Sequence, residues 1–539
     1  MSDAPAIGAT QPRIVHNDYM AIEVPRIGEW EPSLSVTVVI PAYQEQEKLD
    51  LTLAGLKAQT YPSHLLDVVI VDDGSSPALR VPDLAPDRTV MVRSAPDGWG
   101  SAHAVGTGVG HARGDVVLRL DADMLVQESH VEAHMRWHHS ADYLVVLGDM
   151  TFVDFQAGEH TPESVHRSIK EDGFKDLFAA DRAVNSWAGG VIRDTNQLLN
   201  AGNKAYAVCN GATISWTPQL YRAAGGIDRS LVLGGDTELG YRLAQAGAVF
   251  VPEMAARSWH LGIPQMKSRT AEGRKYREPF VNHRMPLRRE HRGTIGRQWK
   301  VPYADIIVDA THASYEDVRA TVQAFLANTI TDINVTLVGP WSGLSDERRS
   351  PLDDPLLELR LTREAFRHDG RVTMTEGVEE TSAPVPFRII CPPGLVPATD
   401  AVEKLVSRAD ENLYGIVNLT VSLGNELRMA RLERTEAISR ALHLRTMSET
   451  AEDVVEKTFG VLWTDGKGWA FNNTAGAKRH KPIGQLHAEV EKFRREAENH
   501  KKASEKWKRQ AQISTKRRIL SALKRRVKKV LPIRRSSGK

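Results

Sequence analysis

Two short runs of β-branched residues, separated by a helical pattern, set the fold class of the N-terminal half of this chain. The first run is SVTVVI at residues 35–40, and the second is LDVVIV at 66–71. Between them, leucines recur at helical spacing as far as residue 59, and Tyr61-Pro62 ends the pattern. A strand, a helix and a strand of these lengths form a βαβ unit, which predicts a mostly parallel sheet with helices on both faces.

Acidic pairs follow two of the predicted strands. Asp72-Asp73 comes directly after 66–71, and Asp121-x-Asp123 follows the strand predicted at 116–120. Ligands of open α/β sheets bind beyond the carboxyl ends of the strands. Two carboxylates at one strand end can converge on Mg²⁺ or Mn²⁺, which prefer oxygen ligands. The structural alternative for each pair is a solvated turn, where Asp is common.

A third acidic segment, Gly234-Gly235-Asp236-Thr237-Glu238, precedes a helix predicted at 239–246. Either acid can serve the helix alone, as an N-cap or as a favourable charge in its first turn. The functional interpretation is that one of these acids is a general base, which must lie near an acceptor hydroxyl. His260 follows a short predicted strand at 249–251. A single histidine is more often structural, but an imidazole here would complete a metal site.

Composition excludes several classes of protein. With 41% hydrophobic and 26% charged residues over 539 positions, the chain reads as a soluble globular protein of several domains. Its two cysteines, Cys209 and Cys391, exclude a disulfide framework and a cysteine-based zinc site. We expect no secretory signal and no transmembrane helix, because no apolar run approaches the roughly 18 residues required.

The strand–helix–strand order recurs later in the chain. Strands are predicted at 304–308 and 333–338, with a helix at 315–326 between them, but the acidic motifs are missing. Three interpretations remain open: a degenerate copy of the first unit, a dimerisation module, or an unrelated α/β domain.

Residues 262–300 are rich in Arg and Lys without a period, and we expect a mobile basic loop there.

The C-terminal tail is strongly basic. From residue 501 onward, 16 Lys and Arg stand against one acid, so the rest of the chain is net acidic although the whole carries +2. Residues 519–531 place their apolar side chains on one helical face, which favours binding to an anionic membrane surface. Nucleic acid is disfavoured as a partner, since Trp507 is the tail's one aromatic residue. A merely solvated terminus is the alternative.

Four motifs occur in order: SVTVVIPAYQEQEKL, VVIVDDGSS, VLRLDADMLV and GGIDRSLVLGGDTELGYRLAQAG. Together they resemble the inverting family 2 glycosyltransferases of GT-A fold, over about residues 35–262. The resemblance implies a nucleotide-sugar donor, with a UDP-sugar favoured, and Mn²⁺ or Mg²⁺ as cofactor. It implies transfer to a hydroxyl of a glycan or lipid-linked acceptor, in cell-surface polysaccharide or glycolipid synthesis. The expected location is cytoplasmic and peripheral, at the inner face of the membrane, and a homo-oligomer is left open.

The resemblance also implies roles for residues at matching positions. Asp236 matches the catalytic base, with Glu238 as the less favoured alternative. Asp121, Asp123 and His260 match the metal ligands. The residues matching the nucleotide-sugar site are Pro41, Tyr43, Asp72, Asp73, Asp121 and Asp123.

The sequence also departs from the family pattern. Val105 and Gly106 stand where Arg and Asn are common, so His103 or Arg113 would have to replace a diphosphate contact. Cations that could stabilise the leaving diphosphate are Lys267, Arg269 and Arg284.

Two other functions use similar residues, and the sequence argues against both. A nucleotidyltransferase would carry a Gly-rich basic loop after the first strand, and PAYQEQEK contains no Gly. A sugar-nucleotide-binding or membrane-associated scaffold would have lost the acids, which all remain. The expected organisation is a lead-in at 1–34, a GT-A domain at 35–300, a second α/β domain at 301–440, a connecting region at 441–484, and a charged helix with the basic amphipathic tail at 485–539.

Overall fold

The computed structural model describes residues 11–262, 269–293, 297–423, 426–466, 472–473 and 492. The predicted basic tail lies outside these residues. None of the helices among them is both long enough and apolar enough to cross a membrane.

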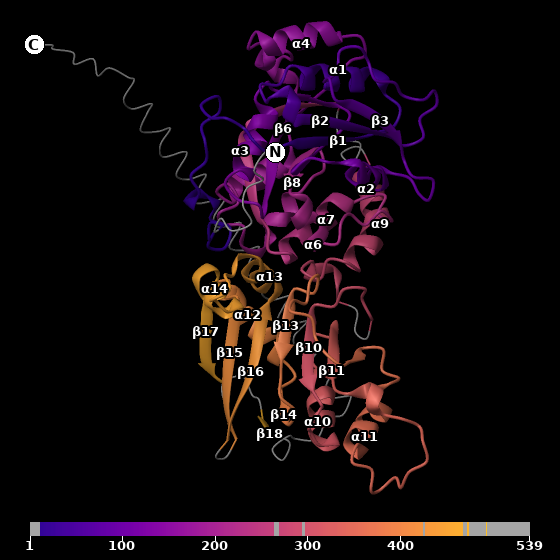
Figure 1. The fold of residues 1–539 in the computed structure, drawn as a ribbon, viewed down its shortest axis with the longest axis vertical. Coiled ribbons are helices and arrows are strands. Elements are labelled where there is room, and N and C mark those ends of the chain that lie inside the picture. Colours follow the sequence, from indigo (N-terminus) through magenta and orange to yellow (C-terminus); the bar gives the residue numbers. More distant parts are fainter. Residues whose placement is uncertain are drawn as a thin grey trace, which may run out of the picture. The chain divides into compact units, whose positions relative to one another are not determined.

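The first sheet carries the acidic motifs (Figure 1). Its strand order is β3-β2-β1-β4-β8-β6-β9-β5, with β7 paired to β6. The pairs among β3, β2, β1 and β4 are parallel, and β8 runs antiparallel to both β4 and β6. The strands are β1 (Val36–Ala42), β2 (Leu66–Asp72), β3 (Thr89–Arg93), β4 (Val116–Leu120), β5 (Met124–Val126), β6 (Leu144–Val153), β7 (Ala183–Asn185), β8 (Thr213–Trp216) and β9 (Val249–Leu261).

Strands β1 and β2 confirm the predicted βαβ unit. Both are buried on their two faces, as the continuous apolar runs require in a parallel sheet. The expected helix between them is α1, whose leucines at 49, 53 and 56 pack into the core. The helices of this region are α1 (Gln46–Lys57), α2 (Ser101–His111), α3 (His130–His138), α4 (Pro162–Lys170), α5 (Trp187–Asp194), α6 (Pro218–Ala223), α7 (Gly235–Gln245) and α9 (Thr270–Asn282).

The expectation of a loop throughout 262–300 is wrong, because α9 occupies the middle of this segment. Its apolar residues are few and scattered among charges, which hides the helical period. Tyr276 and Phe280 stack one turn apart, with ring centroids separated by 5.2 Å. Val281 is buried in the core against residues far away in sequence. The helix therefore depends on tertiary contacts that a local pattern does not reveal.

Three histidines on α3 form a hydrogen-bonded ladder with β8, here called the histidine ladder. His130 Nδ1 lies 3.1 Å from a backbone carbonyl oxygen of β9, so this nitrogen carries the proton. The chain of bonds then runs from His130 through Thr213 (2.8 Å) to His134 (3.1 Å). It continues through Ser215 (2.9 Å) to His138 (2.7 Å). Each hydroxyl donates to one imidazole and accepts from the next, which requires His130 and His134 to be neutral. Burial lowers the pKa of His138 to about 3, so this ring is neutral as well.

The second sheet begins at residue 304 and has the order β12-β11-β10-β13-β16-β15-β17. Its strands are β10 (Ala304–Asp309), β11 (Ile333–Val338), β12 (Val372–Thr375), β13 (Phe387–Ile390), β15 (Ile416–Leu423), β16 (Glu426–Arg434) and β17 (Val461–Asp465), and β14 (Leu395–Val396) pairs separately with β18 (Asn472–Asn473). The helices are α10 (Tyr315–Leu326), α11 (Leu357–Phe366), α12 (Ala401–Glu411), α13 (Thr435–Leu444) and α14 (Ala451–Thr458).

The two sheets have the same connectivity. If the seven main strands of each sheet are numbered in chain order, leaving out β5 and β7, both sheets read 3-2-1-4-6-5-7. The strand directions agree as well, since β13 and β15 both run antiparallel to β16, as β4 and β6 do to β8. At the end of β13, Cys391-Pro392 follows where Asp121 follows β4.

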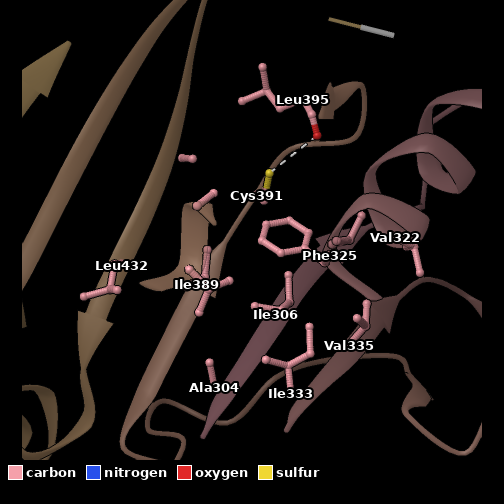
Figure 2. Close-up of a cluster of buried hydrophobic side chains, with 14 of the residues drawn as sticks. Ala304, Ile306, Val322, Phe325, Ile333, Val335, Ile389, Cys391, Leu395 and Leu432 are labelled. Atoms are coloured by element: carbon pink, nitrogen blue, oxygen red, sulfur yellow. Dashed lines mark hydrogen bonds between the residues drawn. The ribbon is translucent and has the colours of Figure 1, made fainter. Parts of the chain in front are cut away.

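A separate apolar core holds the second sheet together (Figure 2). Phe325 from α10 packs among side chains of the central strands, including Ile306 and Ile389. Cys391 is buried at the end of β13, with its Sγ 4.0 Å from the carbonyl oxygen of Leu395. Burial raises the pKa of this thiol well above its usual value, so Cys391 is a packing residue.

Arg440 lies on α13, between β16 and β17 of the second sheet, and connects this part of the chain to the first sheet and the lead-in. Its buried guanidinium donates to the carbonyl oxygens of Gly247 (2.8 Å) and Ala248 (3.0 Å), just before β9. It also donates to those of Ile14 (3.3 Å) and His16 (2.5 Å) in the N-terminal lead-in. Burial lowers the pKa of this guanidinium. Four carbonyl groups from two segments thus depend on one side chain.

Candidate active site

A cavity of about 610 Å³ opens at the carboxyl ends of β1 and β4. This is where the crossover topology directs ligands in open α/β sheets. Seven of the nine predicted site residues line the cavity, and Asp72 and Glu238 do not. The seven are Pro41, Tyr43, Asp73, Asp121, Asp123, Asp236 and His260.

The acidic pair after β2 divides into two roles. Asp72 is buried and accepts from the backbone N–H groups of Ser75 (2.8 Å) and Leu79 (3.3 Å). Burial alone would raise the pKa of Asp72, but these hydrogen bonds outweigh it and lower the pKa. Asp73 lines the cavity, and its Oδ2 accepts from Gly100 N at 2.6 Å. Its Oδ1 is buried without a hydrogen-bond partner, which leaves an acceptor for a ligand N–H.

Asp121, Asp123 and His260 form one cluster. Their ligand atoms all lie within 4.8 Å of one another. His260 belongs to β9, which is longer than predicted and pairs antiparallel with β5, so that His260 lies opposite Met124. His260 Nδ1 is buried without a partner, and Nε2 lies 3.6 Å from Asp123.

The cluster fits a hard divalent cation. Burial raises the pKa of Asp123 to about 6, and the neighbouring His260 acts in the opposite direction. Two carboxylates and an imidazole are ligands that Mn²⁺ and Mg²⁺ accept. Crowded carboxylates beside an imidazole are the features that a cation would satisfy.

Arg119, in the middle of β4, is a site residue that sequence reasoning missed. Its Nη2 donates to Ser101 Oγ (3.0 Å) and to Asp121 Oδ1 (3.2 Å). Gly211 leaves room for it, since a Cβ there would lie 1.8 Å from the guanidinium carbon. An arginine inside the apolar run VVLRL was the available signal. His103 does not line the cavity, because its two nitrogens face Ser94 (2.9 Å) and Asp97 (3.0 Å).

Asp236 and Glu238 lie in opposite environments although they are two residues apart. Asp236 Oδ2 accepts from Gly211 N (3.0 Å) and Oδ1 from Thr237 N (2.8 Å), which fixes the carboxylate in the cavity. Glu238 is buried, and Arg242 donates a hydrogen bond to each of its carboxylate oxygens at 2.7 Å. Arg242 is itself held by backbone carbonyls. Glu238 therefore stabilises α7 and has no access to the cavity.

The cations expected near the leaving group are mostly engaged. Arg284 donates to Asp228 at 2.8 Å, and Arg269 pairs with Glu272. Lys267 lies outside the described residues. Arg277 of α9 lies against Gly234 at the start of α7, and its buried Nε has no hydrogen-bond partner. Burial lowers the pKa of Arg277, and the charge of Asp236 opposes that shift.

Residues 37–185 match the family model described as glycosyl transferase family 2. The chain therefore contains a family 2 glycosyltransferase domain, and its first sheet is the GT-A fold expected of that family. The matched residues include β1 to β7, and so hold Asp73, Asp121 and Asp123.

Curated relatives match over short segments. An uncharacterized glycosyltransferase, YfnE, of Bacillus subtilis is 27% identical over 117 residues, 21% of this chain and 30% of the relative. The undecaprenyl-phosphate 4-deoxy-4-formamido-L-arabinose transferase of Serratia proteamaculans is 35% identical over 102 residues, 17% of this chain and again 30% of the relative. The chain thus spans less than a third of the length of these relatives.

Among solved structures, the mannosyltransferase PcManGT from Pyrobaculum calidifontis, in complex with GDP-Man and Mn²⁺, aligns with a TM-score of 0.31 at 19% identity. The alignment covers 49% of this chain and 65% of that protein. TarS 1–349 of S. aureus, in complex with UDP-GlcNAc, aligns with a TM-score of 0.31 at 17% identity over 48% of this chain and 69% of its own.

Proposed function

We propose that this chain is a metal-dependent inverting glycosyltransferase. The proposed reaction moves a sugar from a nucleotide-diphosphate donor, with a UDP-sugar favoured, to a hydroxyl of a glycan or lipid-linked acceptor. One observation carries the proposal. A single cavity is lined by Asp73, which has an acceptor oxygen without a partner, by three residues that could bind a metal ion, and by the fixed carboxylate of Asp236. These residues lie within and beside a family 2 transferase domain.

The donor half of the cavity is assigned to the loop after β1 and to Asp73. Pro41 and Tyr43 would contact the base, and Asp73 Oδ1 would accept a pyrimidine N–H, which is the reason for favouring uridine. Asp121, Asp123 and His260 would hold Mn²⁺ or Mg²⁺, which offsets the charge on the diphosphate when bound. Arg119 neutralises part of the charge of Asp121 and fixes its orientation.

The acceptor half is assigned to Asp236. Its carboxylate takes the proton of an acceptor hydroxyl as that oxygen attacks the anomeric carbon. The bond from the anomeric carbon to the diphosphate oxygen breaks with its electron pair, and the nucleoside diphosphate leaves. Attack opposite to the leaving group inverts the anomeric configuration. We do not assign this role to Glu238, because both its carboxylate oxygens accept from Arg242.

The biological setting is proposed from the name of one relative and from the composition of the tail. The name of the Serratia relative specifies a lipid phosphate acceptor, which suits surface polysaccharide or glycolipid synthesis. The basic tail would place the enzyme at the inner face of the membrane. For the second sheet we favour the degenerate copy among the three alternatives, because it shares the connectivity of the first sheet and lacks the Asp-Asp and Asp-x-Asp motifs at its strand ends.

Calorimetric titration of UDP, GDP and dTDP tests the proposal. Wild type should bind one nucleotide only with Mn²⁺ or Mg²⁺ present, and Asp123→Ala should abolish that binding. Asp73→Asn should weaken uridine binding by about ten-fold, the value of one buried hydrogen bond to a charged group. Glu163→Gln, an exposed change on α4, is the matched control. Wild type that binds no nucleotide under any condition would refute the proposal.

A further inference from the structure

One large aromatic side chain of the cavity has no assigned role. Trp187 is the first residue of α5 and lines the cavity, yet it is 60% exposed. Its helix is firmly placed, because Ser186 Oγ caps it at Gly189 N (3.0 Å) and Ala188 and Ile192 are buried in the core. An indole held on a rigid element but left uncovered is available to a ligand.

The charges that line the cavity restrict the ligand. Asp236 lines the cavity together with several other acidic residues, which outnumber the basic residues of the lining. Of the basic residues, Lys48 already pairs with Glu45. A phosphate nucleophile is already ionised at neutral pH, so it has no need of a base and would be repelled by Asp236. A neutral hydroxyl needs the base and meets no such repulsion. The acceptor half therefore suits an uncharged, hydroxyl-rich molecule.

We infer that Trp187 is the stacking platform for a pyranose ring of the acceptor, so that the acceptor is a glycan and not a lipid phosphate. This inference rests on the proposed function. A pyranose presents C–H groups on its faces and hydroxyls on its rim. The negative face of an indole attracts these C–H groups, while the hydroxyls on the rim of the sugar stay free for hydrogen bonds. With its ring against Trp187, the sugar directs a rim hydroxyl into the cavity that Asp236 lines.

Nucleotide release provides the test. Wild type is incubated with Mn²⁺ and UDP-glucose, UDP-galactose or UDP-N-acetylglucosamine, first alone to measure donor hydrolysis. Methyl pyranosides and short oligosaccharides are then added in one arm, and undecaprenyl monophosphate in detergent micelles in the other. Trp187→Ala and Trp187→Phe are compared with Trp463→Ala, which removes a tryptophan of similar exposure (59%) from β17, outside the cavity.

A pyranoside should accelerate release by wild type, and Trp187→Ala should raise its KM by about ten-fold, the upper value for one aromatic contact. Trp187→Phe should stay within about three-fold of wild type, and Trp463→Ala should match wild type both in KM and in donor hydrolysis. Acceleration by the lipid phosphate alone, no response to any pyranoside, or an unchanged KM in Trp187→Ala would each overturn the inference while the transferase proposal stands. Wild type that neither binds nucleotide nor hydrolyses donor would overturn both.

Discussion

Mild acid should destabilise this protein through the histidine ladder. Burial lowers the pKa of His130 to about 4 and of His138 to about 3, and it holds the pKa of His134 well below the usual value. The unfolded chain takes up protons near pH 6.5, whereas the folded ladder stays neutral. The stabilisation is therefore fully present above about pH 6.5 and is lost as the pH falls towards 4.

The expected magnitude follows from linkage. At pH 5.5, a histidine with an unfolded pKa near 6.5 that stays neutral in the fold costs about 1.4 kcal/mol, so the three rings together cost about 4 kcal/mol relative to pH 7.5. Urea unfolding at the two pH values, followed by circular dichroism, measures the loss. His134→Gln keeps an N–H donor and an acceptor in the ladder but cannot titrate, so its loss should be smaller by about a third.

Comparing the two pH values within each variant cancels the intrinsic cost of the substitution. His64→Gln removes an exposed histidine and should keep the wild-type pH dependence. If His134→Gln loses as much stability as wild type between pH 7.5 and 5.5, the ladder is not neutral in the fold and the reasoning is wrong.

Three further predictions concern the site and the contact between the sheets. Asp236→Asn should lower acceptor-dependent transfer by about 10²–10⁴-fold with nucleotide affinity unchanged; a matching fall in nucleotide affinity by calorimetry would argue against a base. Gly211→Ala should displace the Arg119 guanidinium from Asp121 and weaken metal-dependent nucleotide binding by about ten-fold, the value of one hydrogen bond to a charged group; wild-type affinity would contradict that role of Arg119. Arg440→Met leaves four carbonyl groups unpaired and should lower the free energy of unfolding by about 3–5 kcal/mol. A loss under about 1 kcal/mol in urea unfolding would show that water replaces the guanidinium.

Much of the first sheet could be predicted because its signals are local. Strands β1, β2 and β4 are largely apolar runs, and β2 and β4 lead directly into acids, which the rule for parallel sheets then gathers at one edge. The parts of the site that local signals do not place depend on long-range contacts. His260 reaches the cluster through pairing of β9 with β5. Glu238 is held outside the cavity by Arg242. The spacing of Asp236 and Glu238 along the sequence does not predict which of the two acids lines the cavity.

Helix α9 and the last strands of the second sheet illustrate the same limit. The buried Val281 of α9 packs against residues distant in sequence, so the local sequence pattern alone predicts a basic loop. In the second sheet, the strand–helix–strand pattern gave β10 and β11. The antiparallel insertion of β16 between β13 and β15 is a property of pairing, which hydropathy does not encode.

The shared connectivity of the two sheets bears on how the chain folds during synthesis. Every main strand of one sheet has a counterpart with the same neighbours in the other, so a nascent chain offers each strand two sets of partners, a known route to misassembly. The order of synthesis separates them, since β9 is complete before β10 leaves the ribosome. The lead-in at residues 14–16 must wait, because Arg440, which binds it, is made 424 residues after His16, and the carbonyl of Thr458 later still. A segment that is made early is thus secured late.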